Sequence, residues 1–87
     1  MSDAYVYMLR CRDNSLHTGW TNNLKNRLSD HNKGKGAKYT RSRLPVKLVY
    51  YKKVDDKSQA LKLEIKLKKL SKRKKELLVK DFSKNLP

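Results

Sequence analysis

The sequence predicts a small domain that mixes strands and helices, and three observations support this prediction. Two β-prone stretches, residues 4–11 and 16–21, are joined by the polar turn Arg12-Asp13-Asn14-Ser15. A third stretch, rich in Val and Tyr, spans residues 46–54. The segments after the second and third stretches repeat apolar residues at helical spacing. With 87 residues, the chain makes one domain whose core runs from about residue 4 to 82.

The first two stretches place their side chains alternately on the two faces of a sheet. In the first stretch, Tyr5, Tyr7 and Leu9 share one face. Because the period is two, His17 joins Tyr7 on that face when the connection between the strands holds an odd number of residues. Gly19 lies inside the second stretch, where glycine weakens strand pairing. It indicates either a plain bulge or a close approach by another group.

A helix follows the second stretch, and Asn22 or Asn23 can cap its start. Arg27 and His31 are four residues apart and fall on the same side of this helix as its two leucines. A cation and an imidazole on a core-facing side cost free energy unless something holds them there. Either Arg27 pairs with a buried carboxylate while His31 caps the helix end, or both residues belong to a functional site. Their occurrence together favours the site.

Residues 33–43 form a loop or a broken helix, with glycines at positions 34 and 36. Glycines expose backbone N–H groups, cations pair with phosphate, and an aromatic ring can stack on a splayed base. As a solvated loop, the same run would be ordinary in a lysine-rich protein. The candidate nucleic-acid contacts in this basic run are Lys33, Lys35, Lys38, Tyr39, Arg41 and Arg43.

Pro45 opens the third strand, which spans residues 46–54. Asp56, with Gln59 three residues later, predicts a capping box for a helix over residues 57–70.

Ser71 is expected to interrupt this helix and to cap a last one that runs to about Asp81. The final residues, 83–87, are expected to be frayed.

Glu64 is the only acidic residue in the helix over residues 57–70, and it projects between the two apolar stripes of that helix. Two interpretations are open. Glu64 can form an ion pair with Lys68, one turn further on. Alternatively, its carboxylate is held inward to bind a metal ion.

The net charge is extreme for this length: Lys+Arg 23 against Asp+Glu 8 leaves +15. Residues 1–56 hold 12 basic and 5 acidic residues, and residues 57–87 hold 11 and 3, so both halves are cationic. Nucleic acid is the default partner of such a field, because phosphate neutralisation supplies most non-specific affinity. The alternatives are a solubility role, or an acidic protein or membrane as partner.

Cysteine and histidine usage excludes two common classes of small protein. Cys11 is the single cysteine, so an intramolecular disulfide cannot form. One Cys and two His, without a C-x-x-C motif, argue against a structural zinc site. We find no signal-peptide pattern and no apolar run of membrane-spanning length, and expect a soluble, cytoplasmic monomer that does not bind membranes.

The order and approximate spacing of these motifs resemble the GIY-YIG nuclease superfamily. The run from His31 to Arg41 is similar to a signature of its small, stand-alone and largely uncharacterised bacterial members. The residues that carry the resemblance are Tyr5-Val6-Tyr7, His17-Thr18-Gly19, Arg27, His31, Glu64 and the run His31-Asn32-Lys33-Gly34-Lys35-Gly36-Ala37-Lys38-Tyr39-Thr40-Arg41.

The resemblance implies an α+β fold with a central three-stranded antiparallel sheet flanked by helices. It also implies cleavage of a nucleic-acid phosphodiester bond that depends on a divalent metal ion. We expect Mg²⁺ or Mn²⁺ as the cofactor and DNA, single-stranded or branched, as the substrate. By this resemblance Glu64 is the metal ligand, and the catalytic residues are Tyr7, His17, Arg27 and His31. In such a site a ring hydroxyl or an imidazole positions and deprotonates water, and Arg27 bridges phosphate oxygens.

The sequence departs from the superfamily pattern at three places. Tyr5 replaces the first glycine of the family name, and His17 replaces the tyrosine of the second motif. A late asparagine has no counterpart except Asn85. His17 is therefore either the base that accepts a proton from water or a tolerated polar residue of the strand. If activity is lost, the alternative function is a catalytically inactive nucleic-acid-binding module. A third alternative is a nuclease domain whose specificity comes from a protein partner.

Overall fold

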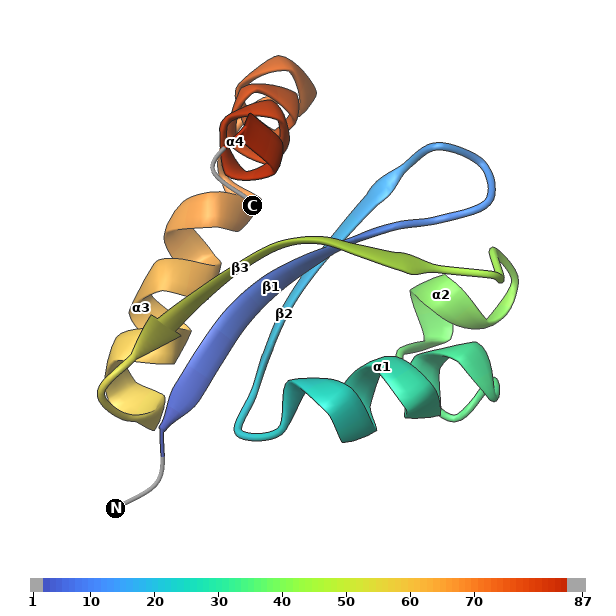
Figure 1. The fold of residues 1–87 in the computed structure, drawn as a ribbon, viewed down its shortest axis with the longest axis horizontal. Coiled ribbons are helices and arrows are strands. Elements are labelled where there is room, and N and C mark those ends of the chain that lie inside the picture. Colours follow the sequence, from blue (N-terminus) through green and yellow to red (C-terminus); the bar gives the residue numbers. More distant parts are fainter. Residues whose placement is uncertain (1–2, 85–87) are drawn as a thin grey trace.

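The computed structural model describes residues 3–84. Its sheet has three antiparallel strands in the order β2-β1-β3, and the helices lie on both sides of it (Figure 1). The predicted α+β fold with a three-stranded antiparallel sheet is therefore confirmed. The elements in chain order are β1 (Ala4–Arg10), β2 (Leu16–Thr21), α1 (Leu24–Asn32), α2 (Lys38–Arg41), β3 (Lys47–Val54), α3 (Lys57–Lys68) and α4 (Lys72–Lys84).

The β1–β2 pairing puts the two predicted rings on one face of the sheet. Tyr7 is opposite Gly19, and Leu9 is opposite His17, so Tyr7 and His17 are diagonal neighbours. Residues 11–15 connect the strands, which is the odd number that this arrangement requires. Asn14 takes a left-handed conformation in the turn, with φ at 71°, a conformation that Asn tolerates better than most residues.

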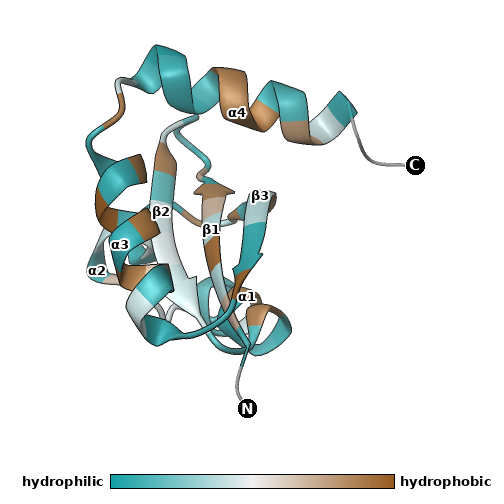
Figure 2. Ribbon diagram, turned by 90° about the vertical axis from the view of Figure 1, so that its left-hand side faces the viewer, coloured by the Kyte–Doolittle hydropathy of each residue, from teal (hydrophilic) through white to brown (hydrophobic). Residues whose placement is uncertain are grey.

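β1 is the central strand and is buried on both faces. On one face Ala4 and Val6 pack with Ala60 and Leu67 of α3. On the other face Tyr7, Leu9, Cys11 and Val46 form a second cluster, which the two leucines of α1 cover. α3 packs along β2 and β1. α4 crosses the ends of the strands, and the middle of this helix carries apolar residues (Figure 2).

The helix starts follow the predicted caps. The Asn23 side chain accepts a hydrogen bond from the Asn26 N–H at 3.1 Å, so Asn23 rather than Asn22 is the N-cap of α1. Asp56 caps α3 through the Gln59 N–H at 2.9 Å. Ser71 accepts from the Lys74 N–H at 3.2 Å at the start of α4.

Four boundaries differ from the sequence prediction. β1 ends at Arg10 rather than at Cys11, so five residues, not the four of the predicted turn, connect β1 to β2. β3 begins at Lys47, one residue later than expected, and α3 ends at Lys68 rather than at residue 70. α4 continues to Lys84, so the expected end at Asp81 and the expected fraying at residues 83 and 84 are wrong. Apolar contact of Phe82 with Tyr50, at 5.6 Å between ring centroids, extends this helix. Asn85 and the rest of the predicted frayed end lie outside the described residues.

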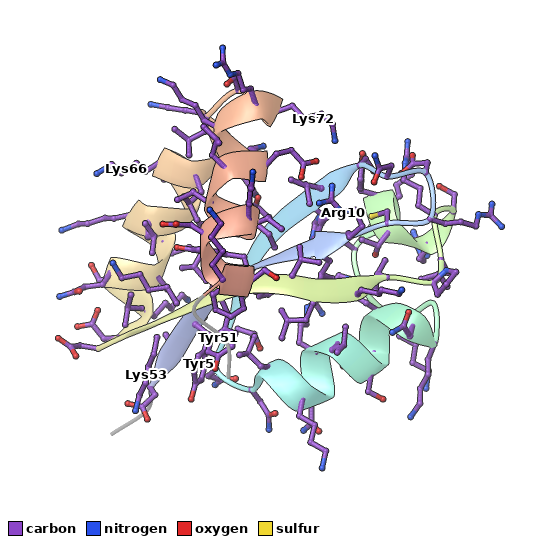
Figure 3. The ribbon with its side chains drawn as sticks, turned by 45° about the horizontal axis from the view of Figure 1, so that its top comes forward. Tyr5, Arg10, Tyr51, Lys53, Lys66 and Lys72 are labelled. Atoms are coloured by element: carbon purple, nitrogen blue, oxygen red, sulfur yellow. The ribbon has the colours of Figure 1, made fainter. Side chains whose placement is uncertain are left out.

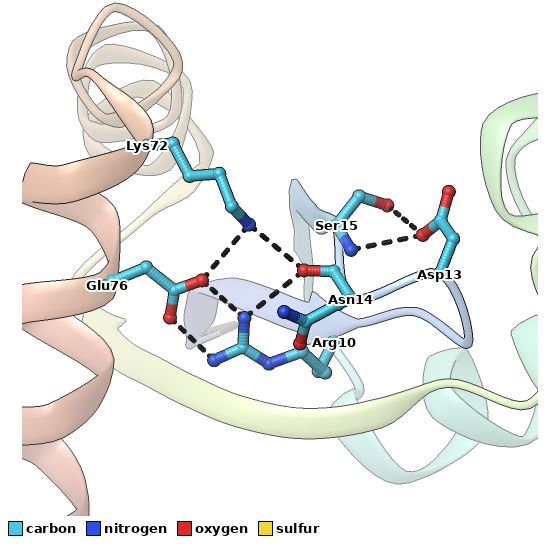
Figure 4. A network of polar contacts seen from close by, with 6 residues as sticks. All are labelled: Arg10, Asp13, Asn14, Ser15, Lys72 and Glu76. Atoms are coloured by element: carbon cyan, nitrogen blue, oxygen red, sulfur yellow. Dashed lines mark hydrogen bonds and ion pairs between the residues drawn. The ribbon is translucent and has the colours of Figure 1, made fainter.

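A polar network fastens α4 to the β1–β2 hairpin (Figure 4). The Arg10 guanidinium donates from Nη1 and Nη2 to the two carboxylate oxygens of Glu76, at 2.5 and 2.6 Å. Lys72 Nζ donates to Glu76 at 3.1 Å and to the Asn14 carbonyl oxygen at 3.0 Å. Arg10 and Lys72 extend from different elements toward this network, whereas Tyr5 and Tyr51 lie side by side at another part of the sheet (Figure 3).

Among the helices of residues 3–84, none combines the length and apolar character needed to span a bilayer.

Candidate functional site

Tyr7, His31 and Thr40 form a buried chain of hydrogen bonds between β1, α1 and α2. The Tyr7 hydroxyl lies 3.1 Å from His31 Nε2, and His31 Nδ1 lies 2.8 Å from Thr40 Oγ1. Thr40 Oγ1 donates in turn to the Ala37 carbonyl oxygen at 2.9 Å. Tyr7 is 2% exposed, and His31 and Thr40 are 0% exposed. The core-facing imidazole predicted from the sequence is therefore held by a partner on each ring nitrogen.

Arg27 extends this chain from the neighbouring turn of α1. Its Nε donates to the Tyr7 hydroxyl oxygen at 3.3 Å. Spacing of four residues along α1 is what lets Arg27 and His31 reach the same hydroxyl. The predicted alternative in which Arg27 pairs with a carboxylate and His31 only caps the helix does not account for this convergence.

The protonation states in this chain follow from burial. Burial raises the pKa of Tyr7, while the hydrogen bond and the charge of Arg27 act in the opposite direction. Burial first, and then the charge of Arg27, lower the pKa of His31 below its usual value. At neutral pH Tyr7 therefore keeps its hydroxyl proton and His31 is an uncharged imidazole.

His17 lies beside this chain and is stacked on Tyr39. The ring centroids of His17 and Tyr39 are 6.0 Å apart with an interplanar angle of 18°, and His17 lies 5.3 Å from His31 by the same measure. Burial, followed by the proximity of His31, Lys68 and Arg27, lowers the pKa of His17 to about 4. His17 is thus uncharged over the whole neutral range.

Gly19 explains how Tyr7 fits beneath β2. A Cβ atom on Gly19 would lie 2.6 Å from the Tyr7 hydroxyl oxygen, closer than packed atoms tolerate. The β1–β2 register runs without a shift through this position. Of the two interpretations of Gly19, the close approach is correct and the bulge is wrong. The irregularity lies instead in the pairing of β1 with β3, between Met8 and Leu9.

Glu64 is partly buried, with 16% of its side chain exposed, and Lys68 Nζ lies 3.6 Å from its carboxylate. Its negative charge acts to raise the pKa of Tyr7, so it lies within electrostatic reach of the hydrogen-bond chain. Within residues 3–84 no three His, Cys, Asp or Glu side chains gather as a metal-binding group. Mg²⁺ is commonly held through one or two carboxylates and keeps several waters, so the donor chemistry of a lone Glu64 fits this ion.

A cavity of about 240 Å³ opens next to His17. Lys68 of α3 and Lys75 of α4 line this cavity together with the stacked rings of His17 and Tyr39. A larger hollow of about 470 Å³ lies between β3 and α3, but none of the predicted site residues lines it. Size alone therefore does not mark the site. The residues that line the smaller cavity are Leu16, His17, Thr18, Tyr39, Lys68 and Lys75.

The predicted basic run divides into an outward and an inward part. Lys33, Lys35, Lys38 and Arg41 are exposed. Arg43 is instead engaged by the protein: its guanidinium lies 3.9 Å from the centre of the Tyr39 ring, and its Nε donates to Asp13 at 2.9 Å.

Sequence reasoning missed two residues of the inward part, Thr40 and Gly36. A Cβ atom on Gly36 would overlap the His31 ring, so the chain can close over that ring only with glycine there. The signal for both residues was weak, because their contacts depend on how a short irregular segment folds back.

Comparison with known proteins identifies the family to which the chain belongs. Residues 3–77 match the family of the GIY-YIG catalytic domain. A UPF0213 protein of Syntrophus aciditrophicus is 54% identical over 81 residues, which cover 92% of this chain and 93% of that protein. A UPF0213 protein of Clostridium perfringens is 53% identical over 75 residues, which cover 86% of this chain and 81% of that protein.

Two solution NMR structures share the fold. The UPF0213 protein of Bacillus halodurans has a TM-score of 0.58 at 46% identity, covering 90% of this chain and 83% of that one. A protein from E. faecalis has a TM-score of 0.62 at 37% identity, covering 100% and 96%. The family match spans most of the chain, and the similarity covers 81% to 96% of the length of these relatives. The chain therefore belongs to the GIY-YIG family of nuclease domains.

Proposed function

We propose that this protein hydrolyses phosphodiester bonds in DNA, single-stranded or branched, with Mg²⁺ or Mn²⁺ bound through Glu64. The observation that carries the proposal is the Tyr7 hydroxyl, which lies 3.1 Å from His31 Nε2 and 3.3 Å from Arg27 Nε. A phenol between a proton acceptor and a cation is arranged to take up a proton while negative charge develops beside it.

In the proposed reaction Tyr7 is the group that faces the attacking water. Its oxygen donates to His31 and accepts from Arg27, which leaves one lone pair for a water O–H. As the water oxygen bonds to phosphorus, its proton passes to Tyr7 and the Tyr7 proton passes to His31 Nε2. The bond from phosphorus to the leaving sugar oxygen breaks, and that oxygen is protonated from solvent.

Cations near the site would hold the phosphate. Arg27 uses Nε for Tyr7, and within residues 3–84 its two terminal nitrogens make no hydrogen bond, so they are available to phosphate oxygens. Lys68 and Lys75 line the cavity next to His17. The metal ion, once bound by Glu64, would supply further stabilisation of negative charge on the phosphate. Lys68 would then release Glu64 and turn toward the substrate.

The charge of +15 supports a polyanionic substrate, and the exposed members of the basic run supply further phosphate contacts. We propose Lys33, Lys35, Lys38 and Arg41 as these contacts.

The deciding experiment is incubation of the protein with labelled single-stranded, duplex and branched DNA, in Mg²⁺, Mn²⁺ or EDTA. We expect cleavage with either metal and none in EDTA. Glu64→Gln should cleave at no detectable rate, yet bind DNA as tightly as the parent or slightly more tightly. Mn²⁺ binding measured by calorimetry should be lost in the same variant. Parental cleavage and Mn²⁺ binding in Glu64→Gln would overturn the metal assignment.

One observation favours a second candidate, the catalytically inactive nucleic-acid-binding module. Lys68 Nζ already lies 3.6 Å from the Glu64 carboxylate, where it competes with a metal ion. DNA binding without cleavage of any substrate in the panel, together with no Mn²⁺ binding, would establish this alternative.

A further inference from the structure

Thr40 is the one residue of the run 33–43 that is buried. Thr40 is 0% exposed, whereas its neighbour Tyr39 is 40% exposed. A carbonyl oxygen can only accept, so the single hydroxyl hydrogen of Thr40 is used in the 2.9 Å bond to the Ala37 carbonyl oxygen. Towards His31 Nδ1, at 2.8 Å, Thr40 Oγ1 can therefore only accept. The hydrogen of the neutral imidazole must then sit on Nδ1.

This assignment fixes every proton along the chain. With hydrogen on Nδ1, His31 Nε2 carries a lone pair and accepts from the Tyr7 hydroxyl, 3.1 Å away. The Tyr7 oxygen in turn accepts from Arg27 Nε at 3.3 Å. In the opposite tautomer two lone pairs would face each other between Nδ1 and Thr40. Nε2 would then donate to the Tyr7 oxygen instead of accepting its proton.

We propose that Thr40 is a positioning residue that selects the Nδ1-protonated tautomer of His31 and so makes Nε2 the acceptor for the Tyr7 proton. This inference rests on the proposed function, since the tautomer matters for catalysis only if Tyr7 passes a proton to His31. It gives the basic run a second role besides contact with phosphate.

Gly36 is the second part of this arrangement. Because a Cβ atom there would overlap His31 Nδ1, any side chain would push the ring away from Thr40. Glycine at position 36 and threonine at position 40 thus enclose the same edge of the imidazole.

The test compares Thr40→Val, which keeps the shape and removes the hydroxyl, with Thr40→Ser, which keeps the hydroxyl. The ¹⁵N chemical shifts of the His31 imidazole report directly which nitrogen is protonated, without any need for activity. We expect hydrogen on Nδ1 in the parent and in Thr40→Ser, and a shift toward Nε2 in Thr40→Val. DNA cleavage should fall by about 10² in Thr40→Val, the size typical of losing proton-transfer help, and recover in Thr40→Ser.

Thr18→Val is a matched control for the spectra. Thr18 is 4% exposed, and its hydroxyl is the buried side-chain oxygen without a partner among residues 3–84. Its loss should leave the His31 spectrum unchanged. If Thr40→Val does not fold, Thr40→Ala provides the same test with a smaller side chain.

The outcomes separate this inference from the proposed function. Hydrogen on Nδ1 in both Thr40→Val and Thr40→Ala would overturn the role of Thr40, even if the parent cleaves DNA. A tautomer shift with an unchanged cleavage rate would also overturn it. If the parent cleaves no substrate but the tautomer shifts as expected, the proposed function fails while the structural assignment of Thr40 holds.

Discussion

Gly19 lies opposite Tyr7 across the β1–β2 pair, so close that a Cβ atom at this position would be 2.6 Å from the Tyr7 hydroxyl oxygen. Gly19→Ala should therefore displace the Tyr7 ring and break its hydrogen bonds to His31 and Arg27. We expect DNA cleavage to fall by at least about tenfold and the free energy of unfolding to fall by about 1–3 kcal/mol, as for an overpacked core. Cleavage assays and urea unfolding measure the two effects.

Gly34→Asn is the control for this substitution. Gly34 has a φ of 78°, which Asn adopts more readily than other residues, and no atom lies within 4 Å of a Cβ built there. The control should retain both stability and cleavage. If Gly19→Ala matches it in both, the steric role of Gly19 is wrong.

Gly19 also shows where sequence reasoning reaches its limit. The alternation of β1 and β2 predicted only that Tyr7 and His17 share a face if the connection holds an odd number of residues. The end of β1 at Arg10 makes that number five, and the sequence pattern did not specify it. The pattern also left open whether Gly19 marks a bulge or a close approach, since both leave the same residue in the sequence. The actual irregularity opposite Met8 and Leu9 had no signal, because the third strand is β-prone throughout.

The candidate site was predictable where a residue type conflicted with its position. Arg27 and His31 fall on the apolar side of α1, and that conflict pointed to a partner before the partner was known. Thr40 produces no such conflict, because threonine is ordinary in a polar run. Its burial depends on α2 folding back over His31, which is a tertiary effect that local patterns do not encode.

Nucleic-acid binding should depend on the outward residues of the basic run. Lys38→Ala and Arg41→Ala should each weaken binding alike for all sequences and reduce the slope of log K against log[salt] by about 0.9 on duplex DNA. Lys80→Ala, on α4 and outside the run, should have a smaller effect. Fluorescence anisotropy over a range of salt concentrations measures these slopes. Binding that does not respond to salt would contradict the prediction.

Arg43→Ala should behave differently from these two variants. Arg43 is held by Asp13 and lies over the Tyr39 ring. Removal of the Arg43 side chain should lower the free energy of unfolding and leave one face of the Tyr39 ring without a contact. Lys38→Ala should leave the free energy of unfolding unchanged. If Arg43→Ala weakens DNA binding as Lys38→Ala does and keeps the parental stability, the contacts of Arg43 with Asp13 and Tyr39 do not stabilise the fold.

The ion pair between Arg10 and Glu76 should make the free energy of unfolding depend on pH in the acidic range. Hydrogen bonds from Arg10, and then from Lys72, lower the pKa of Glu76 from 4.5 to about 2. A carboxyl with a lowered pKa in the folded state stabilises the fold above pH 4.5, and this contribution is lost as the pH falls from 4.5 toward 2. The Glu76 side chain is 33% exposed, so we expect roughly 1 kcal/mol at pH 7.

Urea unfolding of the parent and of Glu76→Gln at pH 7 and pH 3 tests this. The variant should be less stable than the parent at pH 7, with the difference shrinking at pH 3 and in high salt. Asp55→Asn, which changes an exposed acidic residue outside the network, is the control. A difference that stays constant with pH would mean that the ion pair does not stabilise α4.

A second effect of pH on stability should come from His17. It arises from the burial of an uncharged group rather than from an ion pair. Its pKa is lowered from 6.5 to about 4 in the fold, so the unfolded chain takes up a proton that the folded chain refuses. The stability due to neutral His17 is full above pH 6.5 and falls as the pH drops toward 4. Urea unfolding at pH 7.5 and pH 5 measures how much the free energy of unfolding falls between these two pH values. This decrease should be smaller in His17→Gln than in the parent. His31 contributes in the same direction, so part of the loss remains. Equal losses would contradict the shift.

The same lowered pKa determines what His17 does in catalysis. An imidazole with a pKa of about 4 is uncharged at pH 7, but it is a weak proton acceptor. The Tyr7 hydroxyl, in contrast, lies 3.1 Å from His31 Nε2, which accepts the Tyr7 proton in the tautomer that we propose. We therefore expect Tyr7→Phe to lower cleavage by about 10² or more, and His17→Gln to lower it by less than tenfold. The pH–rate profile of His17→Gln should have the same shape as that of the parent. In neither protein do we expect His17 to cause an inflection near pH 6.5. If His17→Gln removes most activity and Tyr7→Phe does not, His17 is the base and Tyr7 only orients the water.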